Sequence, residues 1–258
     1  MIDCNARVIE QHRLTDDYLL LLLEAPAVTV SAHPGQFVHV RVTGLDDASL
    51  RRPFSIYGAD HGVLALVYKT VGRGTEQLAR LAGGDTVSVI GPLGNGFPLD
   101  CGDRMPVLVA GGYGVAPLSY LARRLGRRGV VLVGARSAAD VLCVEDFTEL
   151  EWDIRVSTQD GSRGERGLVT DLLDACLAAP SATPPEIYAC GPDGMLRAVG
   201  ERAGAAGARA WLSLDKHMVC GVGACLACVQ RLRRADGTEW IGRVCHDGPV
   251  FEAREIVW

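Results

Sequence analysis

Four cysteines near the C-terminal end constrain this chain more than any other feature of its sequence. Cys220, Cys225 and Cys228 follow the pattern C-x4-C-x2-C, and Cys245 lies further along the chain. This spacing is typical of [2Fe-2S] sites, in which four thiolates hold the cluster. The last stretch of the chain has no long periodic segment, and such a short segment folds more readily around a metal site.

The residues between these cysteines suit a tight ligand loop. Gly221 and Gly223 accept positive φ angles, so the loop can wrap a compact anion and turn its backbone N–H groups towards sulfur. The alternative is a structural Cys4 zinc site, but such sites usually pair two short hairpins, and only one is present. The motif therefore predicts a [2Fe-2S] cluster held by Cys220, Cys225, Cys228 and Cys245, with zinc as the alternative.

The other sequence-wide features indicate an ordinary protein of a reducing compartment. The total of nine cysteines is odd, and five are dispersed, which does not fit a disulfide scaffold. The apolar runs, such as residues 19–23, are too short to span a membrane, and residues 1–5 lack a signal-peptide layout. The net charge of -5 with scattered basic residues predicts no nucleic-acid binding. We expect a soluble cytoplasmic protein.

The pattern of apolar residues divides the chain into three parts. Short apolar runs broken by turn residues predict an antiparallel barrel or sandwich, with strands at residues 18–23, 37–42, 54–57, 63–68 and 86–90. Alternating strands and helices then predict a parallel sheet, with strands at 106–110, 130–133, 154–157 and 187–189 and helices at 118–125, 168–178 and 196–206. We expect a β plus α/β fold, with an antiparallel β-barrel at residues 1–101, a parallel-sheet domain at 102–212 and a small C-terminal domain at 213–258.

Two features of the first domain suit a phosphate-bearing cofactor. The tetrapeptide Arg52-Pro53-Phe54-Ser55 offers a guanidinium for a pyrophosphate and a hydroxyl for a ring edge. After Lys69, the run Gly72-Arg73-Gly74-Thr75 opens a predicted helix at residues 76–81, where backbone N–H groups could receive phosphate. The alternative is that Arg52 pairs with a surface carboxylate and that the glycines only form a turn.

A glycine-rich turn marks the second domain. A predicted strand at residues 105–110 runs into Gly111-Gly112-Tyr113-Gly114 and then into a helix. Such a turn lets the backbone approach a pyrophosphate. The turn differs from the G-x-G-x-x-G fingerprint, so by itself it is also compatible with an ordinary strand-to-helix connection.

Together these motifs resemble the ferredoxin-NADP reductase superfamily. Its flavin signature, R-x-[YF]-S followed by a G-x-G-T turn, is matched by residues 52–55 and 72–75. Its nucleotide motifs G-x-G-[VI]-A-P and C-G-P-x-x-M are matched by residues 112–117 and 190–195, although Tyr113 replaces a small or aliphatic residue. The resemblance implies bound FAD and NAD, with segment 91–97 linking the two domains.

The resemblance also implies a role for each matching residue. Ser55 would lie near the reactive flavin nitrogen and Cys190 near the nicotinamide, and these are the candidate catalytic residues; the alternative for Cys190 is an ordinary buried thiol. Residues 158–161 would lie near the ribose. The implied cofactor-binding residues are Arg52, Pro53, Phe54, Ser55, Val67, Tyr68, Lys69, Gly72, Gly74, Thr75, Gly111, Gly112, Gly114, Gly191 and Pro192.

Over essentially its whole length the chain resembles the electron-transfer subunit of NAD-linked, class 1B dihydroorotate dehydrogenase. Residues 213–228 and 245–251 carry this resemblance, with Asp215 where that family often has Glu. It implies an FMN-containing catalytic partner that oxidises dihydroorotate to orotate in pyrimidine biosynthesis, in a heterotetramer with two of each subunit. Electrons would then pass through the cluster and FAD to NAD+.

Two other functions remain open at this point. The small subunit of NADH-dependent ferredoxin-NADP oxidoreductases and sulfide dehydrogenases is similar in all three segments. A non-redox protein with a structural metal site is the other alternative. No clear basic pair for a 2'-phosphate is evident, although Arg136 and Arg163 lie nearby in the sequence, so we expect NAD(H) to be preferred over NADP(H).

Overall fold

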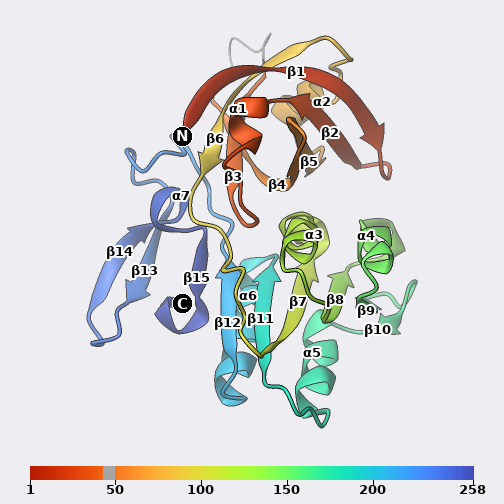
Figure 1. Cartoon of the computed structure of the whole chain (residues 1–258), viewed down its shortest axis with the longest axis vertical. Helices are drawn as coiled ribbons and strands as arrows, with labels where there is room; N and C mark the ends of the chain where they lie inside the picture. The colour runs from red at the N-terminus through yellow and green to blue at the C-terminus, as the bar shows by residue number, and fades with distance from the viewer. Residues whose placement is uncertain (43–49) are drawn as a thin grey trace.

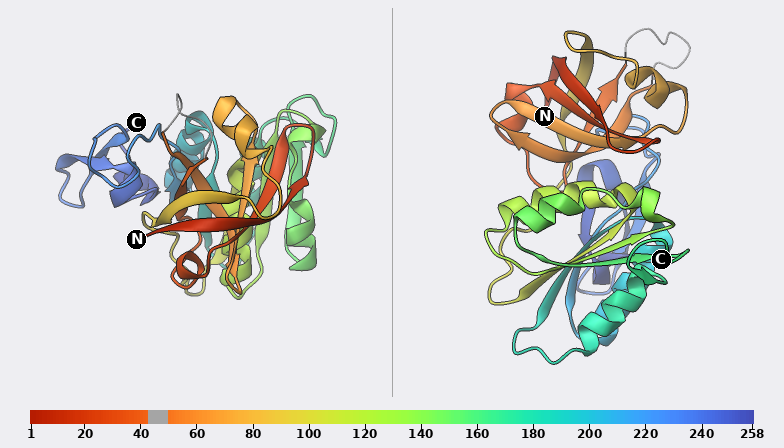
Figure 2. Two further views of the ribbon diagram at one scale, coloured as in Figure 1. Left: turned by 90° about the horizontal axis from the view of Figure 1, so that it is seen from above. Right: turned by 90° about the vertical axis from the view of Figure 1, so that its right-hand side faces the viewer.

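The computed structural model describes residues 1–42 and 50–258. A barrel lies above a helix-covered sheet, and a small hairpin lies beside the sheet (Figure 1). Seen from above, this hairpin projects to one side of the other two parts (Figure 2). Among the described residues, no helix has the length and apolar character needed to cross a membrane.

The N-terminal part is a closed antiparallel barrel with the strand order β1-β2-β5-β4-β3-β6. The strand pattern alone is compatible with a barrel or a sandwich, and the pairing of β1 with β6 closes the sheet and confirms the predicted barrel. The strands are β1 (Ile2–Arg13), β2 (Tyr18–Glu24), β3 (Phe37–Arg41), β4 (Arg52–Asp60), β5 (Val63–Lys69) and β6 (Thr86–Leu93), with short helices α1 (Pro26–Thr29) and α2 (Arg73–Leu78).

Strand β3 separates two cores. Val38 and Val40 point into the barrel and pack with its other buried side chains. Phe37, which lies on the opposite face of the strand, packs into the core beneath the barrel. The outer face of β3 is therefore buried against the second half of the molecule.

The second part is a seven-stranded sheet with the order β10-β9-β8-β7-β11-β12-β15. Its parallel strands are β7 (Met105–Gly111), β8 (Val130–Ala135), β9 (Asp153–Thr158), β10 (Glu165–Arg166), β11 (Pro185–Cys190) and β12 (Arg209–Ser213). The strand β15 (Val250–Glu252) pairs antiparallel with β12.

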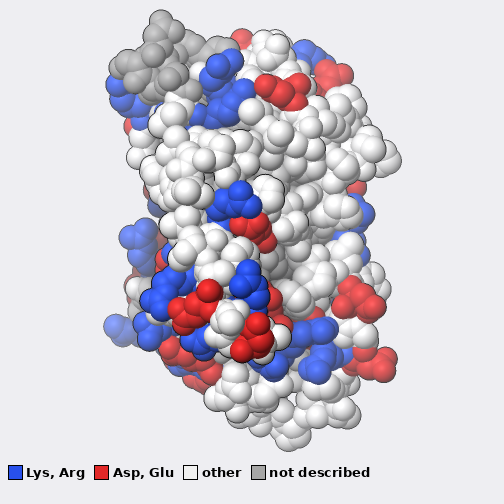
Figure 3. Space-filling view, turned by 90° about the vertical axis from the view of Figure 1, so that its left-hand side faces the viewer, with Lys and Arg blue, Asp and Glu red and all other residues white. Residues whose placement is uncertain are grey.

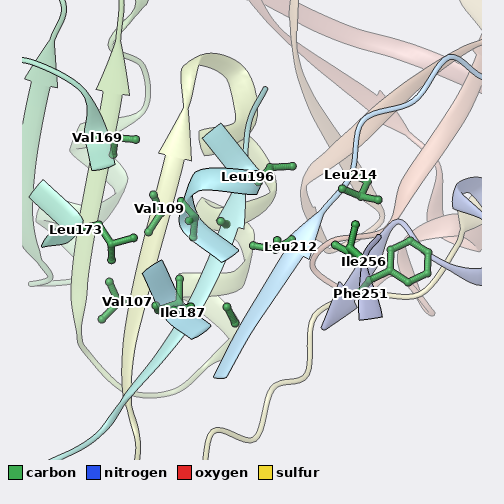
Figure 4. Close-up of a cluster of buried hydrophobic side chains, with 14 of the residues drawn as sticks. Val107, Val109, Val169, Leu173, Ile187, Leu196, Leu212, Leu214, Phe251 and Ile256 are labelled. Carbon is green, nitrogen blue, oxygen red and sulfur yellow. The ribbon is translucent and has the colours of Figure 1, made fainter. Parts of the chain in front are cut away.

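Helices cover both faces of this sheet. Buried side chains of α3 (Val115–Arg124) and α4 (Val144–Glu149) pack on one face. Those of α5 (Val169–Ala178) and α6 (Asp193–Ala205) pack on the other. The core on the α5 and α6 side continues without a break to Leu214, Phe251 and Ile256 (Figure 4).

The C-terminal segment is built onto this sheet. It contains the hairpin β13 (Val229–Arg233) and β14 (Glu239–Arg243), the helix α7 (Val244–Asp247), and the 3-10 turn η3 (Ala253–Glu255). Cys228 and Cys245 are buried in the same core as Val107 of β7. Packing against the sheet therefore stabilises a segment that is too short to form a sizeable core alone.

Candidate electron-transfer site

A cavity of about 1070 Å³ lies where the barrel meets the sheet. Apart from Gly72 and Gly74, every implied catalytic or cofactor-binding residue lines it. Of residues 158–161, which were expected near the ribose, only Gln159 lines it. The segment that leads to the cysteine loop, Ser213 to Met218, also lines the cavity. The fold thus brings three distant stretches of sequence to one site.

The two motifs of the barrel meet at one point of this cavity. A Cβ atom added to Gly74 would lie 2.2 Å from the Arg52 Nε atom, so the guanidinium lies directly against this glycine. Helix α2 begins at Arg73, earlier than the predicted residue 76. The Thr75 hydroxyl accepts hydrogen bonds from the N–H groups of Val71 (2.9 Å) and Gly72 (3.2 Å) and fixes the turn.

Lys69 joins the barrel to the sheet. Its Nζ lies 3.2 Å from an Asp17 carboxylate oxygen and 3.7 Å from Asp140, which belongs to the 3-10 turn η2 (Ala138–Asp140). Tyr18 also donates a hydrogen bond to Asp140, at 3.2 Å. Neither Tyr18 nor Asp140 was predicted for the site, because only the folded chain brings them together.

The two nucleotide motifs also touch. Gly111 ends β7 and Gly114 ends the 3-10 turn η1 (Gly112–Gly114). A Cβ atom on Gly114 would lie 2.2 Å from the Cys190 carbonyl oxygen, and one on Gly111 would lie 2.7 Å from the Met195 sulfur. Only glycine permits this approach. Burial, together with the Asp215 carboxylate, raises the pKa of Cys190 to about 12, so this side chain is a protonated thiol at neutral pH.

The four clustered cysteines form two neighbouring pairs. Cys220 lies beside Cys225, and Cys228 lies beside Cys245. Across residues 1–42 and 50–258, no three His, Cys, Asp or Glu side chains converge closely enough to hold one metal ion. Two pairs of thiols suit the two irons of a [2Fe-2S] cluster better than a single tetrahedral zinc ion.

Backbone N–H groups point at these sulfurs, as a thiolate cluster requires. Cys245 Sγ accepts a hydrogen bond from Gly223 N–H at 3.1 Å, and Cys220 Sγ accepts one from Ala224 N–H at 3.3 Å. Gly221 and Gly223 have φ angles of 71° and 81°, the positive values expected from the sequence. The donors and the loop geometry therefore fit an iron-sulfur cluster.

His39 lies beside this loop and was not predicted to belong to the site. It is fully buried in β3, and burial together with the nearby Arg51 guanidinium lowers its pKa to about 4. A single histidine inside the apolar run Phe37-Val38-His39-Val40 is the only sequence signal it gives.

Comparison with known protein families gives the same three parts. An oxidoreductase FAD-binding domain matches residues 5–97, and an oxidoreductase NAD-binding domain matches residues 108–201. The iron-sulfur cluster binding domain of dihydroorotate dehydrogenase B matches residues 215–257. The predicted FAD-binding, NAD-binding and iron-sulfur parts are confirmed.

Similar proteins match over nearly the whole chain. The electron transfer subunit of dihydroorotate dehydrogenase B (NAD(+)) from Geobacillus kaustophilus is 42% identical over 257 residues, which cover 97% of this chain and 96% of that protein. The protein of the same name from Bacillus caldolyticus is 43% identical, with the same coverage. This chain belongs to that family. The resemblance stated from the sequence is therefore confirmed.

Solved structures show how widely the electron-transfer subunit shares its fold. A structure of NADH-dependent reduced ferredoxin-NADP oxidoreductase is similar with a TM-score of 0.84 and 30% identity, covering 98% of this chain and 90% of that one. An Amycolatopsis cytochrome P450 reductase is similar with a TM-score of 0.67 and 28% identity, covering 80% of this chain and 66% of that one. The first therefore matches all three parts of the subunit.

Proposed function

We propose that this chain carries electrons from the FMN of a dihydroorotate dehydrogenase catalytic subunit, through a [2Fe-2S] cluster and FAD, to NAD+. The observation that carries this function is the shared cavity. It is lined by the flavin motif of the barrel, the glycine turn of the sheet, and the segment that runs directly into Cys220. Residues for all three redox groups therefore adjoin one site.

The three groups are needed together because NADH carries an electron pair and a [2Fe-2S] cluster takes electrons singly. Bound FAD supplies the chemistry that connects them, because a flavin exchanges electrons either in pairs or singly. Arg52 would bind its pyrophosphate and Ser55 would offer a hydroxyl to its ring. Gly112, where an added Cβ atom would meet no atom within 4 Å, would leave room for the nucleotide pyrophosphate, and Cys190 would meet the nicotinamide as a neutral thiol.

The catalytic partner is proposed to dock over the cysteine loop. Cys225 is exposed, whereas Cys228 and Cys245 are buried, so the cluster would lie closest to the surface at Cys225. Large apolar side chains that are more than a third exposed occur in the cysteine loop and in the hairpin that follows it: Val219, Val222 and Leu226 in the loop, and Val229 and Ile241 in the hairpin. On this side of the molecule, basic and acidic side chains are interspersed (Figure 3). Apolar contact would therefore contribute most to docking.

A pair of surface variants tests this docking site. Leu226→Asp places a charge in the centre of the proposed interface, and we expect it to abolish co-elution with the catalytic subunit. Leu14→Asp is the matched control, because Leu14 is also exposed and directly follows β1. The C-terminal end of β1 lies on the side away from the hairpin (Figure 1). Equal complex formation by both variants would contradict the site.

The assembly we propose contains two copies of each subunit and acts in the cytoplasm.

The proposed reaction is tested by reconstitution. The purified chain, loaded with FAD and cluster, is mixed with the catalytic subunit, dihydroorotate and NAD+ under anaerobic conditions. We expect one NADH for each orotate formed with both subunits, and no NADH with either subunit alone. NADH formation by this chain alone would exclude the assigned division of labour.

A second candidate follows from the structural similarity to NADH-dependent reduced ferredoxin-NADP oxidoreductase. In that function the chain would exchange electrons with a partner that uses NADP and ferredoxin. Mixing the chain with such a partner distinguishes the two functions. Ferredoxin-dependent NADPH formation, without any response to dihydroorotate, would favour the second candidate.

A further inference from the structure

His39 faces the cysteine loop from the outer side of the barrel. Its neighbours Val38 and Val40 point into the barrel core, while Phe37 packs in the core that also holds Cys228 and Cys245. Because side chains alternate along a strand, His39 shares the face of Phe37. Its exposed fraction is 0%.

The imidazole ring lies directly against the backbone of the loop. A Cβ atom on Gly221 would lie 2.6 Å from His39 Nδ1 and 3.1 Å from its Cε1 atom. The ring also lies close to the backbone of Cys220. Arg51 links β3 to β6 beside this ring, since its Nη1 donates hydrogen bonds to the carbonyl oxygens of His39 (3.3 Å) and Ser88 (3.0 Å).

Both ring nitrogens of His39 lack a hydrogen-bond partner within residues 1–42 and 50–258. A buried donor or acceptor without a partner costs about 1–3 kcal/mol, so native proteins rarely retain one without a reason. The ring has two such atoms beside a ligand loop. The backbones of Cys220 and Arg51 lie close enough to the ring to raise its pKa against the effect of burial, so carbonyl acceptors adjoin the ring without a well-formed hydrogen bond.

We propose that His39 is a positioning residue for the iron-sulfur loop, donating a ring N–H to the Cys220 carbonyl oxygen when the cluster is bound. This inference rests on the cluster assigned above to the four cysteines. The hydrogen bond fixes the peptide between Cys220 and Gly221. It also ties the loop to the strand that pairs with the flavin motif, because His39 lies opposite Pro53.

The proposed hydrogen bond from His39 affects the reduction potential of the cluster through the backbone of the cysteine loop. A fixed peptide at Gly221 holds the turn that aims the N–H groups of Ala224 and Cys225 at Cys220 Sγ, at 3.3 and 3.4 Å. Hydrogen bonds to cluster sulfurs set the reduction potential, and outer partners orient the groups that make them. Loss of the His39 donor therefore weakens these bonds and makes the potential more negative.

Three substitutions separate the donor from the bulk of the ring. His39→Leu removes the donor and keeps an apolar side chain, His39→Asn places an amide N–H near the Nδ1 position, and His39→Gln places one near Nε2. The readouts are the midpoint potential of the cluster and the EPR spectrum of its reduced form, with iron, sulfide and FAD contents measured on the same samples.

For His39→Leu we expect a more negative midpoint potential, an altered EPR spectrum and several-fold faster loss of cluster absorbance in air, at wild-type FAD content. One of the two amide variants returns the potential and the spectrum to wild type. Val40→Ala is the matched control, because it opens a cavity on the opposite face of the same strand. It lowers the melting temperature and leaves the potential unchanged.

The inference is overturned if His39→Leu keeps the wild-type potential and spectrum, or if both amide variants behave like the leucine variant. Should the leucine variant fail to fold, the amide variants decide, since a shifted potential in both contradicts the role of the donor. Wild-type protein without iron and sulfide would instead overturn the proposed function, so the two failures are distinguishable.

Discussion

The Tyr113 hydroxyl donates a hydrogen bond to the Asp215 carboxylate across the cavity, with 3.1 Å between Oη and Oδ2. Tyr113 belongs to the glycine turn η1, and Asp215 belongs to the segment that leads to Cys220. The sequence analysis singled out both residues as departures from family motifs, Tyr113 in place of a small or aliphatic residue and Asp215 in place of Glu. In the folded chain the two departures contact each other. Burial, and then the Asp215 carboxylate, raises the pKa of Tyr113 to about 12.

This bond predicts a pH-dependent contribution to stability. A tyrosine in an unfolded chain titrates near about 10, below its value in the folded state. The protonated hydroxyl therefore contributes its full stabilisation at pH values below about 10. This contribution is lost as the pH rises towards about 12. Tyr113 is 49% exposed, so solvent screens this bond, and the difference in the free energy of unfolding between wild type and Tyr113→Phe is expected to stay below about 1 kcal/mol at neutral pH and to shrink across that window. Urea titrations at several pH values measure it; a constant difference would contradict it.

Alanine substitution should lower the FAD affinity at one of two glycines in the same turn and leave it unchanged at the other. Gly74→Ala places a Cβ against the Arg52 guanidinium, which must move, so we expect at least a tenfold loss of FAD affinity in a folded protein. Gly72→Ala meets no atom within 4 Å and needs no unusual backbone angle, so its affinity should match wild type. Flavin fluorescence titration of both apoproteins checks the pair, and equal affinities would remove Arg52 from the site.

Asp146 is expected to hold the barrel on the sheet. Tyr57 of β4 donates to its carboxylate at 2.6 Å, and Arg123 of α3 lies at 3.3 Å. Removing a partly buried carboxylate that accepts charged and neutral donors should cost about 2–3 kcal/mol in Asp146→Ala. Asp153→Ala, which breaks an exposed pair with Arg155, should cost less than about 1 kcal/mol. Chemical denaturation compares them, and similar losses would contradict the assigned role.

The nucleotide preference follows from the edge of the cavity. Arg136 lines it and Arg163 does not, so within residues 1–42 and 50–258 these two arginines do not form a basic pair for a 2'-phosphate at the cavity. We expect NADH to reduce a flavin-reactive dye with a higher kcat/KM than NADPH. A clear advantage for NADPH would show that this interpretation of the cavity edge is wrong.

Local patterns predicted much of this molecule. The cysteine spacing identified the cluster loop, and the order of strands and helices identified the parallel sheet, because each depends on residues close in sequence. The polar alternation of β1, with only Ala6 and Val8 fully buried, gave no apolar run, so the strand that closes the barrel was missed.

Contacts between distant segments were beyond the reach of these patterns. The antiparallel pairing of β15 with β12 depends on how the last segment folds back, which its composition does not encode. His39 and Asp140 belong to the site only because the barrel packs on the sheet. Neither residue belongs to a local sequence motif, so neither could be predicted before that packing was known. The glycines of the flavin and nucleotide motifs could be predicted, because each lies in a short motif that the sequence shows directly.

The most direct test of the electron path is the variant Cys225→Ser, compared with Cys4→Ser, which alters a cysteine of β1 outside the cluster. With the catalytic subunit present, Cys225→Ser should lose dihydroorotate-dependent NADH formation and retain FAD and NADH oxidation by a flavin-reactive dye, while Cys4→Ser should keep both activities. Dihydroorotate-dependent NADH formation by Cys225→Ser at the wild-type rate would show that electrons bypass the cluster and would contradict the account.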